Sequence, residues 1–157
     1  MIDGVVDHTY RQVALMEDDY AAMAPASMQP ETRCVSIDEV ARHPLIGQPE
    51  NDFCCARVMN AMRARGYEPN IVFRSADNST VQAMVRAGRG MAVQPKLCID
   101  FNDPGIVPLA IEPPIPPRRI VLIWREEPDV PPAVNRFVEL ACDVAREVSR
   151  ELANTPV

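Results

Sequence analysis

Residues Phe73–Pro95 read FRSADNSTVQAMVRAGRGMAVQP, and they carry the clearest fold signal in the sequence. It starts at the end of a β-branched and aromatic run, which predicts a strand. Four residues that can cap a helix, Asp77–Thr80, come next, and the apolar spacing of Val81–Ala87 predicts a helix that Gly88 ends. Met91–Val93 then form a second short apolar strand. A strand, a capped helix and another strand in this order predict an α/β domain with a mostly parallel sheet.

Strands and helices also alternate on both sides of this stretch. Upstream, Ser36 and Glu39 form a capping-box pattern in front of a short helix that Pro44 ends. The last helix is the most regular one, because its apolar residues keep helical spacing from Val134 to Leu152. The other predicted elements are extended segments at Val13–Met23, Leu45–Gly47, Asn70–Arg74, Ile106–Ile111 and Arg119–Trp124, and helices at Ile37–Arg42, Phe53–Arg65 and Pro131–Leu152.

Composition restricts the class of protein. The chain has 157 residues, of which 47% are hydrophobic, and its formal net charge is −6. This much apolar surface argues against disorder, and the acidic balance argues against non-specific binding of nucleic acid. No apolar run is long enough for a membrane span, and the N-terminus does not resemble a secretory signal. The five cysteines have no C-x-x-C spacing, which favours a reduced, cytoplasmic compartment.

Signatures of catalysis are weak. The sequence has no phosphate loop and no G-x-S-x-G elbow, and neither His8 nor His43 has companions at metal-ligand spacing. We therefore predict no catalytic residue, no metal and no cofactor. A redox role for the adjacent Cys54 and Cys55 stays open as a minor alternative. The polar group Asp77–Thr80 is the best candidate site, because ligands of α/β sheets bind beyond the carboxyl ends of strands.

The ordered set of motifs resembles LysR-type transcriptional regulators. In that family a strand leads to a capped helix, then to V-x-x-G-x-G and to a short apolar strand that ends in proline, as in Phe73–Pro95. The segments Ser36–Ile46, Asp103–Leu109 and Arg118–Trp124 resemble other parts of the family pattern in the same order. The resemblance extends from about Val13 to about Leu152 and covers nearly the whole chain.

The resemblance implies an effector-binding domain with the two-lobed architecture of type 2 periplasmic binding proteins. By this pattern, residues 20–113 form a complete second lobe, and residues 1–19 and 114–157 form part of the first. A small-molecule effector would bind in a cleft between the lobes. DNA would be contacted only through a winged helix-turn-helix that this chain lacks, and a homodimer or higher oligomer is expected.

The same pattern assigns the effector-binding residues of the second lobe. They belong to the loop after its first strand and to the start of the capped helix: Gln48, Pro49, Asn51, Asp77, Asn78, Ser79 and Thr80. Simple helix capping is the plain explanation for the last four, and the two roles are compatible. The alternative functions are a dimerisation or interaction module, and a solute-binding protein or enzyme on the same fold.

Overall fold

The computed structural model describes residues 9–126 and 130–155, which divide into two compact units. Unit 1 holds the described residues up to Asp18 together with Arg118–Thr155, and unit 2 runs from Asp19 to Pro117. The chain therefore passes between the units twice. None of the helices in the described ranges combines the length and apolar character that a bilayer crossing requires.

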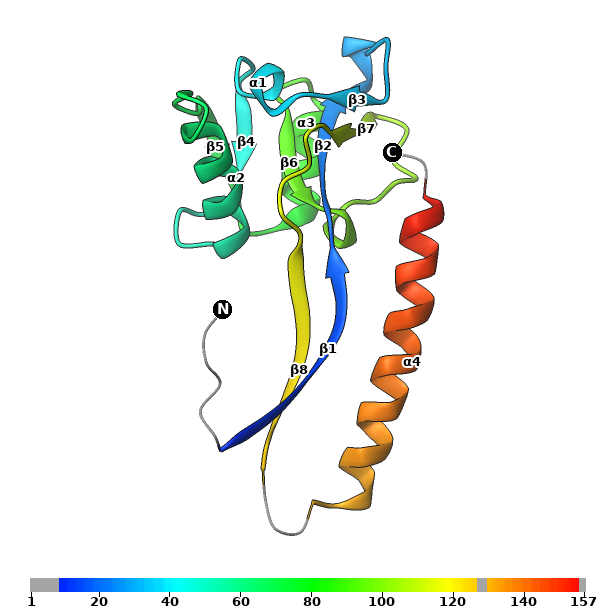
Figure 1. Ribbon diagram of the computed structural model, residues 1–157. Coiled ribbons are helices and arrows are strands. Elements are labelled where there is room, and N and C mark those ends of the chain that lie inside the picture. Colours follow the sequence, from blue (N-terminus) through cyan, green and yellow to red (C-terminus); the bar gives the residue numbers. More distant parts are fainter. Residues whose placement is uncertain (1–8, 127–129, 156–157) are drawn as a thin grey trace. The chain divides into compact units, whose positions relative to one another are not determined.

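Unit 1 is a long antiparallel ribbon with one helix. Strand β1 (Tyr10–Asp18) pairs with β8 (Arg118–Arg125), and α4 (Pro132–Asn154) packs against β1. Figure 1 shows α4 as the red and orange helix at the C-terminal end of the chain. The predicted final strand and the predicted final helix are both confirmed, to within two residues at each boundary. The segment predicted as extended over Val13–Met23 contains two strands, because Asp19 separates β1 from the next one.

Unit 2 is an α/β unit. Its strands are β2 (Tyr20–Pro25), β3 (Cys34–Val35), β4 (Leu45–Gly47), β5 (Ile71–Arg74), β6 (Ala92–Pro95) and β7 (Ile106–Ile111). Its helices are α1 (Ile37–Val40), α2 (Phe53–Arg63) and α3 (Asn78–Arg86), with short 3-10 turns at η1 (Ala26–Met28) and η2 (Lys96–Cys98). Ser36 caps α1 by accepting a hydrogen bond from the Glu39 amide at 3.1 Å, as the capping-box pattern predicts.

The sheet of unit 2 is mixed, so the expectation of a mostly parallel sheet is wrong. Its four-stranded part has the order β3-β7-β2-β6, and β2 runs antiparallel to both β6 and β7. The pairs β3/β7 and β4/β5 are parallel, and a parallel bridge between Leu45 and Met91 joins β4 to the β6 end of the sheet. All six residues of β2 are buried. Such a continuous apolar run is typical of a strand covered on both faces, and it does not encode strand direction.

The segment that enters β4 and the one that enters β6 lie side by side and are joined by backbone hydrogen bonds. The Met91 amide donates to Pro44 O at 2.9 Å, and the Ile46 amide donates to Met91 O at 2.8 Å. A Cβ atom built on Gly90 would lie 2.4 Å from the backbone oxygen of Pro44. Only glycine therefore fits at the point where the two segments meet.

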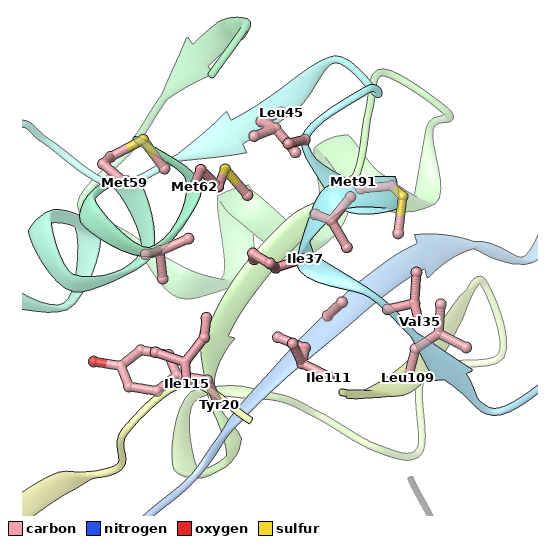
Figure 2. Close-up of a cluster of buried hydrophobic side chains, with 14 of the residues drawn as sticks. Tyr20, Val35, Ile37, Leu45, Met59, Met62, Met91, Leu109, Ile111 and Ile115 are labelled. Carbon is pink, nitrogen blue, oxygen red and sulfur yellow. The ribbon is translucent and has the colours of Figure 1, made fainter. Parts of the chain in front are cut away.

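The core of unit 2 has two parts, one on each face of β2. Tyr20, Ala22 and Ala24 belong to one cluster, and Ala21 and Met23 belong to the other. The first cluster, drawn in Figure 2, packs β2 against α1 and α2 and contains several buried methionines. The second packs β2 against α3. The small alanines of β2 let helices approach the sheet closely from both sides.

A buried ion pair closes the ribbon of unit 1 where the chain leaves it. Asp18 and Arg118 are register partners at the end of β1 and the start of β8. Asp18 is completely buried, and its Oδ2 accepts from Arg118 Nε at 2.8 Å and from Nη2 at 2.7 Å. The pair is therefore a fixed connection between the two strands at the boundary with unit 2.

Removing the guanidinium should destabilise the fold, because the buried Asp18 carboxylate loses the positive charge and the two hydrogen bonds that Arg118 supplies. We expect Arg118→Met to lower the free energy of unfolding by about 3–5 kcal/mol in urea denaturation. Arg119→Met is the matched control, since Arg119 is exposed on the same strand. Equal effects of the two substitutions would contradict this role of the buried pair.

Candidate functional site

The candidate site lies at the edge of unit 2 where three strands end. Because β4 runs parallel to β5 and is bridged in parallel to the β6 end of the sheet, their carboxyl ends point to the same edge. Gln48 follows β4, the start of α3 follows β5, and Gln94 lies at the end of β6. In α/β sheets this edge is where ligands bind.

Asp77 organises the first turn of α3. Its Oδ2 accepts from the Thr80 amide at 2.8 Å, from Thr80 Oγ1 at 2.6 Å and from Ser79 Oγ at 2.7 Å. These three donors lower the pKa of Asp77 from 3.8 to about 2, so the carboxylate is ionised at neutral pH. The helix begins at Asn78 rather than at Val81, so the expected boundary is three residues late. Asp77 is the N-cap, and the next three residues belong to the helix.

Asn78 is the meeting point of three amide side chains. Its Oδ1 accepts from Gln94 Nε2 at 3.0 Å and from Gln48 Nε2 at 3.5 Å. The structure thus brings two of the predicted residues, Gln48 and Asn78, into contact and adds Gln94, which the sequence did not single out. The only signal in the sequence was a polar residue inside the short apolar run before Pro95.

Pro49 and Asn51 lie in the turn between β4 and α2. The backbone oxygen of Pro49 accepts from the Asp52 amide at 2.9 Å, and Asp52 in turn caps α2 through the Cys55 amide at 2.9 Å. Within the described residues, no hydrogen bond joins Pro49 or Asn51 to the amide group around Asn78. Their part in ligand binding stays a prediction.

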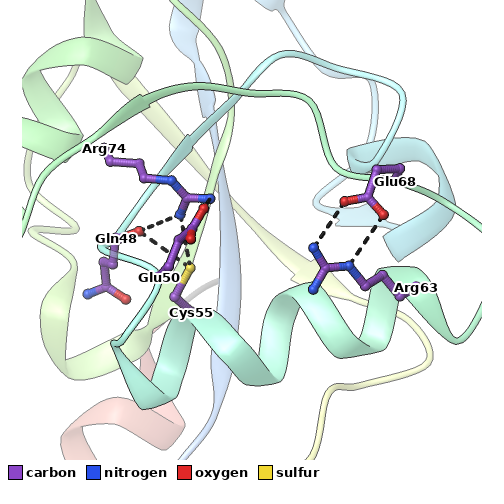
Figure 3. A network of polar contacts seen from close by, with 6 residues as sticks. All are labelled: Gln48, Glu50, Cys55, Arg63, Glu68 and Arg74. Carbon is purple, nitrogen blue, oxygen red and sulfur yellow. Dashed lines mark hydrogen bonds and ion pairs between the residues drawn. The ribbon is translucent and has the colours of Figure 1, made fainter.

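Arg74 holds the loop that carries Gln48 (Figure 3). Its Nη1 donates to Gln48 O at 2.8 Å, and its Nη2 pairs with Glu50 Oε1 at 3.1 Å. The Cys55 thiol, which is buried, donates to the same Gln48 oxygen at 3.4 Å. The Arg74 guanidinium therefore already has hydrogen-bond partners within the protein. The redox alternative for Cys54 and Cys55 gains no support from this burial, and it stays untested.

Figure 3 also shows a second ion pair, at the C-terminal end of α2. Arg63 donates to the two carboxylate oxygens of Glu68 at 3.0 and 3.3 Å, which lowers the pKa of Glu68. Both side chains are well exposed, and such pairs contribute little to stability. This pair therefore has no direct part in the candidate site.

The site is an open edge rather than a closed pocket. Gln48 borders a small apolar cavity of about 10 Å³ beneath α2, which is too small for a ligand. A larger hollow of about 270 Å³ lies elsewhere in unit 2, between η1, α1 and β7. It is lined by Met28, Cys34 and His43 among others and by none of the seven predicted residues. Within the described residues, no three His, Cys, Asp or Glu side chains are placed to hold a metal ion.

Comparison with known proteins identifies the class. Residues 2–146 match the LysR substrate binding domain family, so the chain belongs to that family. The chain is therefore a LysR substrate-binding domain, the regulatory part of a family that is not one of enzymes. The fold is the one expected, with the α/β architecture of periplasmic-binding-protein-like regulatory domains.

One curated relative is an uncharacterized HTH-type transcriptional regulator of Bacillus subtilis, YcgK. The two sequences are 30% identical over 118 residues, which are 75% of this chain and 34% of YcgK. The chain therefore spans about a third of the length of the curated relative it matches.

Solved structures share the fold at low sequence identity. HinK, a LysR family regulator from Pseudomonas aeruginosa, matches 92% of this chain and 51% of its own with a TM-score of 0.76 and 18% identity. A mutant of OxyR from Corynebacterium glutamicum matches 96% of this chain and 48% of its own, with a TM-score of 0.74 and 17% identity. The regulatory domain of Synechocystis CcmR, in complex with 2-PG, matches 87% of this chain and 67% of its own, with a TM-score of 0.73 and 12% identity.

The Asp77 cap should make the stability of unit 2 depend on pH in a defined window. Because the folded-state pKa lies below the ordinary 3.8, the ionised cap stabilises the fold above about pH 4, and this contribution is lost as the pH falls towards 2. We expect Asp77→Ala to have a lower Tm than the wild type at pH 7, and the two values to converge at low pH. Asp77→Asn, which can still cap, should lose less. A constant Tm difference across the range would contradict this assignment.

Proposed function

We propose that the effector binds at the edge of unit 2 around Gln48, Asn78 and Gln94. The observation that carries this proposal is that two amide side chains, Gln48 just after β4 and Gln94 in β6, both donate to the side-chain oxygen of Asn78 in α3. Amide groups can exchange their partners for those of a ligand without any change of charge. The effector would then replace the contact between Gln48 and Asn78, which at 3.5 Å is the longer of the two.

The remaining predicted residues have supporting roles in this proposal. Asp77 fixes the first turn of α3 by binding the Ser79 and Thr80 hydroxyl groups. Pro49 and Asn51 shape the rim beside Gln48. We assign residues 20–113 to the second lobe and residues 1–19 and 114–157 to part of the first, as the family pattern implies.

Regulation then follows from coupling between effector binding and a second state of the regulator. A ligand shifts such an equilibrium only if its affinity for the two states differs. The complex of the CcmR regulatory domain with 2-PG supports the idea that a domain of this fold holds a small metabolite. The regulator would act in the cytoplasm and contact DNA through a winged helix-turn-helix, a module that would lie outside residues 1–157.

The effector assignment can be tested with matched asparagine variants. We expect some compounds from a library of small metabolites to raise the Tm of the wild type, and Asn78→Ala to abolish that rise. Asn60→Ala is the control, because Asn60 is exposed on α2 and away from the strand ends. Alanine is tolerated at both helical positions, but Asn78→Ala also removes the partner of Gln94 Nε2, so each variant's ligand-induced rise is measured from its own Tm without ligand. Compounds that stabilise Asn78→Ala as much as the wild type would refute the site.

An interaction module is the second candidate, and one observation favours it. Phe137, Leu140 and Val144 follow one another at helical spacing on α4, and they are 59%, 45% and 57% exposed. An apolar stripe of this kind favours association, and we propose a second copy of the chain as the partner.

Sedimentation velocity tests the association. We expect the wild type to form dimers or larger species, and Phe137→Glu to shift the distribution towards monomer by burying a charge in the contact. Arg136→Glu, an exposed neighbour on the same helix, should leave the distribution unchanged. A wild type that stays monomeric at high concentration would exclude this alternative.

A further inference from the structure

We propose that Gln94 is the specificity-determining residue of this site, and that its side-chain oxygen selects an uncharged ligand carrying an N–H or O–H donor. This inference rests on the proposed effector site and adds the chemical class of the ligand. It assigns a function to a residue that neither the sequence pattern nor the family match singled out.

The Gln94 side chain is buried but only half used. The residue is 1% exposed at the end of β6, and its Nε2 donates to Asn78 Oδ1 at 3.0 Å. Its Oε1 is also buried and has no hydrogen-bond partner among the described residues. Nearly all buried polar groups in folded proteins are satisfied, and an orphaned acceptor costs stability. A ligand that displaces the contact between Gln48 and Asn78 would find this acceptor without a partner.

Gln82 shows how this protein uses a buried glutamine for structure alone. It is 8% exposed on α3, its Nε2 donates to Cys98 O at 3.2 Å, and its Oε1 accepts from the Asp100 amide at 3.0 Å. Both ends of this amide are therefore satisfied within the protein. Gln82 is therefore a structural residue, whereas the side-chain oxygen of Gln94 is left for another molecule.

The charges at the edge disfavour an anionic ligand. The Asp77 carboxylate is next to Asn78, is ionised, and already takes the Thr80 amide that would otherwise attract an anion. The Arg74 guanidinium is bound to Glu50 and to the Gln48 backbone oxygen. Lys96, two residues beyond Gln94, is the cation nearest to Gln94 in the sequence, so it is the one to remove when anion binding is tested.

Hydrogen bonding points the same way. A carboxylate or phosphate oxygen placed against Gln94 Oε1 would bring two hydrogen-bond acceptors together. A hydroxyl or amide donor would instead give this oxygen a hydrogen bond, and the cost of removing the oxygen from water has already been met when the protein folds. Sites built around a buried hydrogen-bonding group reject analogues that lack the matching group by large factors. Ligand discrimination is therefore expected to depend on Gln94 more than on the exposed Ser79.

Stability measurements test the orphaned acceptor without any ligand. Methionine matches glutamine in length and has no strong acceptor, so Gln94→Met removes the unsatisfied oxygen together with one hydrogen bond. We expect its Tm to equal or exceed that of the wild type. Gln82→Met removes the two hydrogen bonds that Gln82 makes to the Asp100 amide and the Cys98 oxygen, and its Tm should fall by about 3 °C or more. A Tm loss in Gln94→Met as large as in Gln82→Met would overturn the inference.

Binding measurements test the ligand class. The side-chain amide signals of Gln94, assigned by their loss in Gln94→Met, are followed by NMR while nicotinamide, D-ribose, malonate or inorganic phosphate is added at equal concentration. We expect at least one neutral probe to shift the Gln94 signals and the two anions to leave them in place. In Gln94→Met, that neutral probe should no longer shift the Asn78 amide signals.

The outcomes separate this inference from the proposed site. Anions that shift the Asn78 signals equally in the wild type and in Gln94→Met would overturn the inference and leave the effector site standing. The same holds if Lys96→Ala abolishes anion binding. Failure of both neutral probes to shift the Gln94 signals would also overturn the inference, while the metabolite screen with Asn78→Ala tests the site independently.

Discussion

Burial of β2 on both faces is the constraint on which unit 2 depends. Every residue of this strand is buried, and its alternating side chains enter two different clusters. Its backbone groups are satisfied by β6 on one side and β7 on the other. The register with β6 pairs Ala21 with Gln94. The strand that joins the two clusters therefore also fixes the position of Gln94 along the sheet.

The candidate site combines polar groups that serve the fold with others that do not. Asp77 and Arg74 have their hydrogen bonds within the protein, and they hold α3 and the loop after β4 in place. The amides of Gln48, Asn78 and Gln94 share one acceptor oxygen, so their hydrogen-bonding capacity is only partly used. A rigid support with adaptable amide groups is suited to sensing a molecule rather than to transforming it.

Sequence reasoning recovered the elements because each has a local cause. The helix at Phe53–Arg63 ends close to where the pattern predicted, and the Ser36 cap was identified from its spacing. The start of α3 was predicted three residues too late. Four consecutive residues could each serve as the N-cap, and the sequence does not show that Asp77 is the one whose side chain accepts from the Thr80 amide. Strand direction was also missed, because the alternation of strands and helices indicated a parallel sheet, whereas β2 runs antiparallel to both of its neighbours and its apolar run does not encode direction. Gln94 lies inside an apolar run, and its partner is 16 residues away, so its role required the tertiary structure.

The meeting of β4 with β6 at Gly90 limits how this sequence can evolve. The backbone oxygen of Pro44 occupies the space that any side chain at position 90 would need. Side chains at the neighbouring strand ends can change without touching this backbone, but a side chain at position 90 would push the two segments apart. Substitutions around the proposed site therefore have to leave this backbone contact, four residues before Gln94, in place.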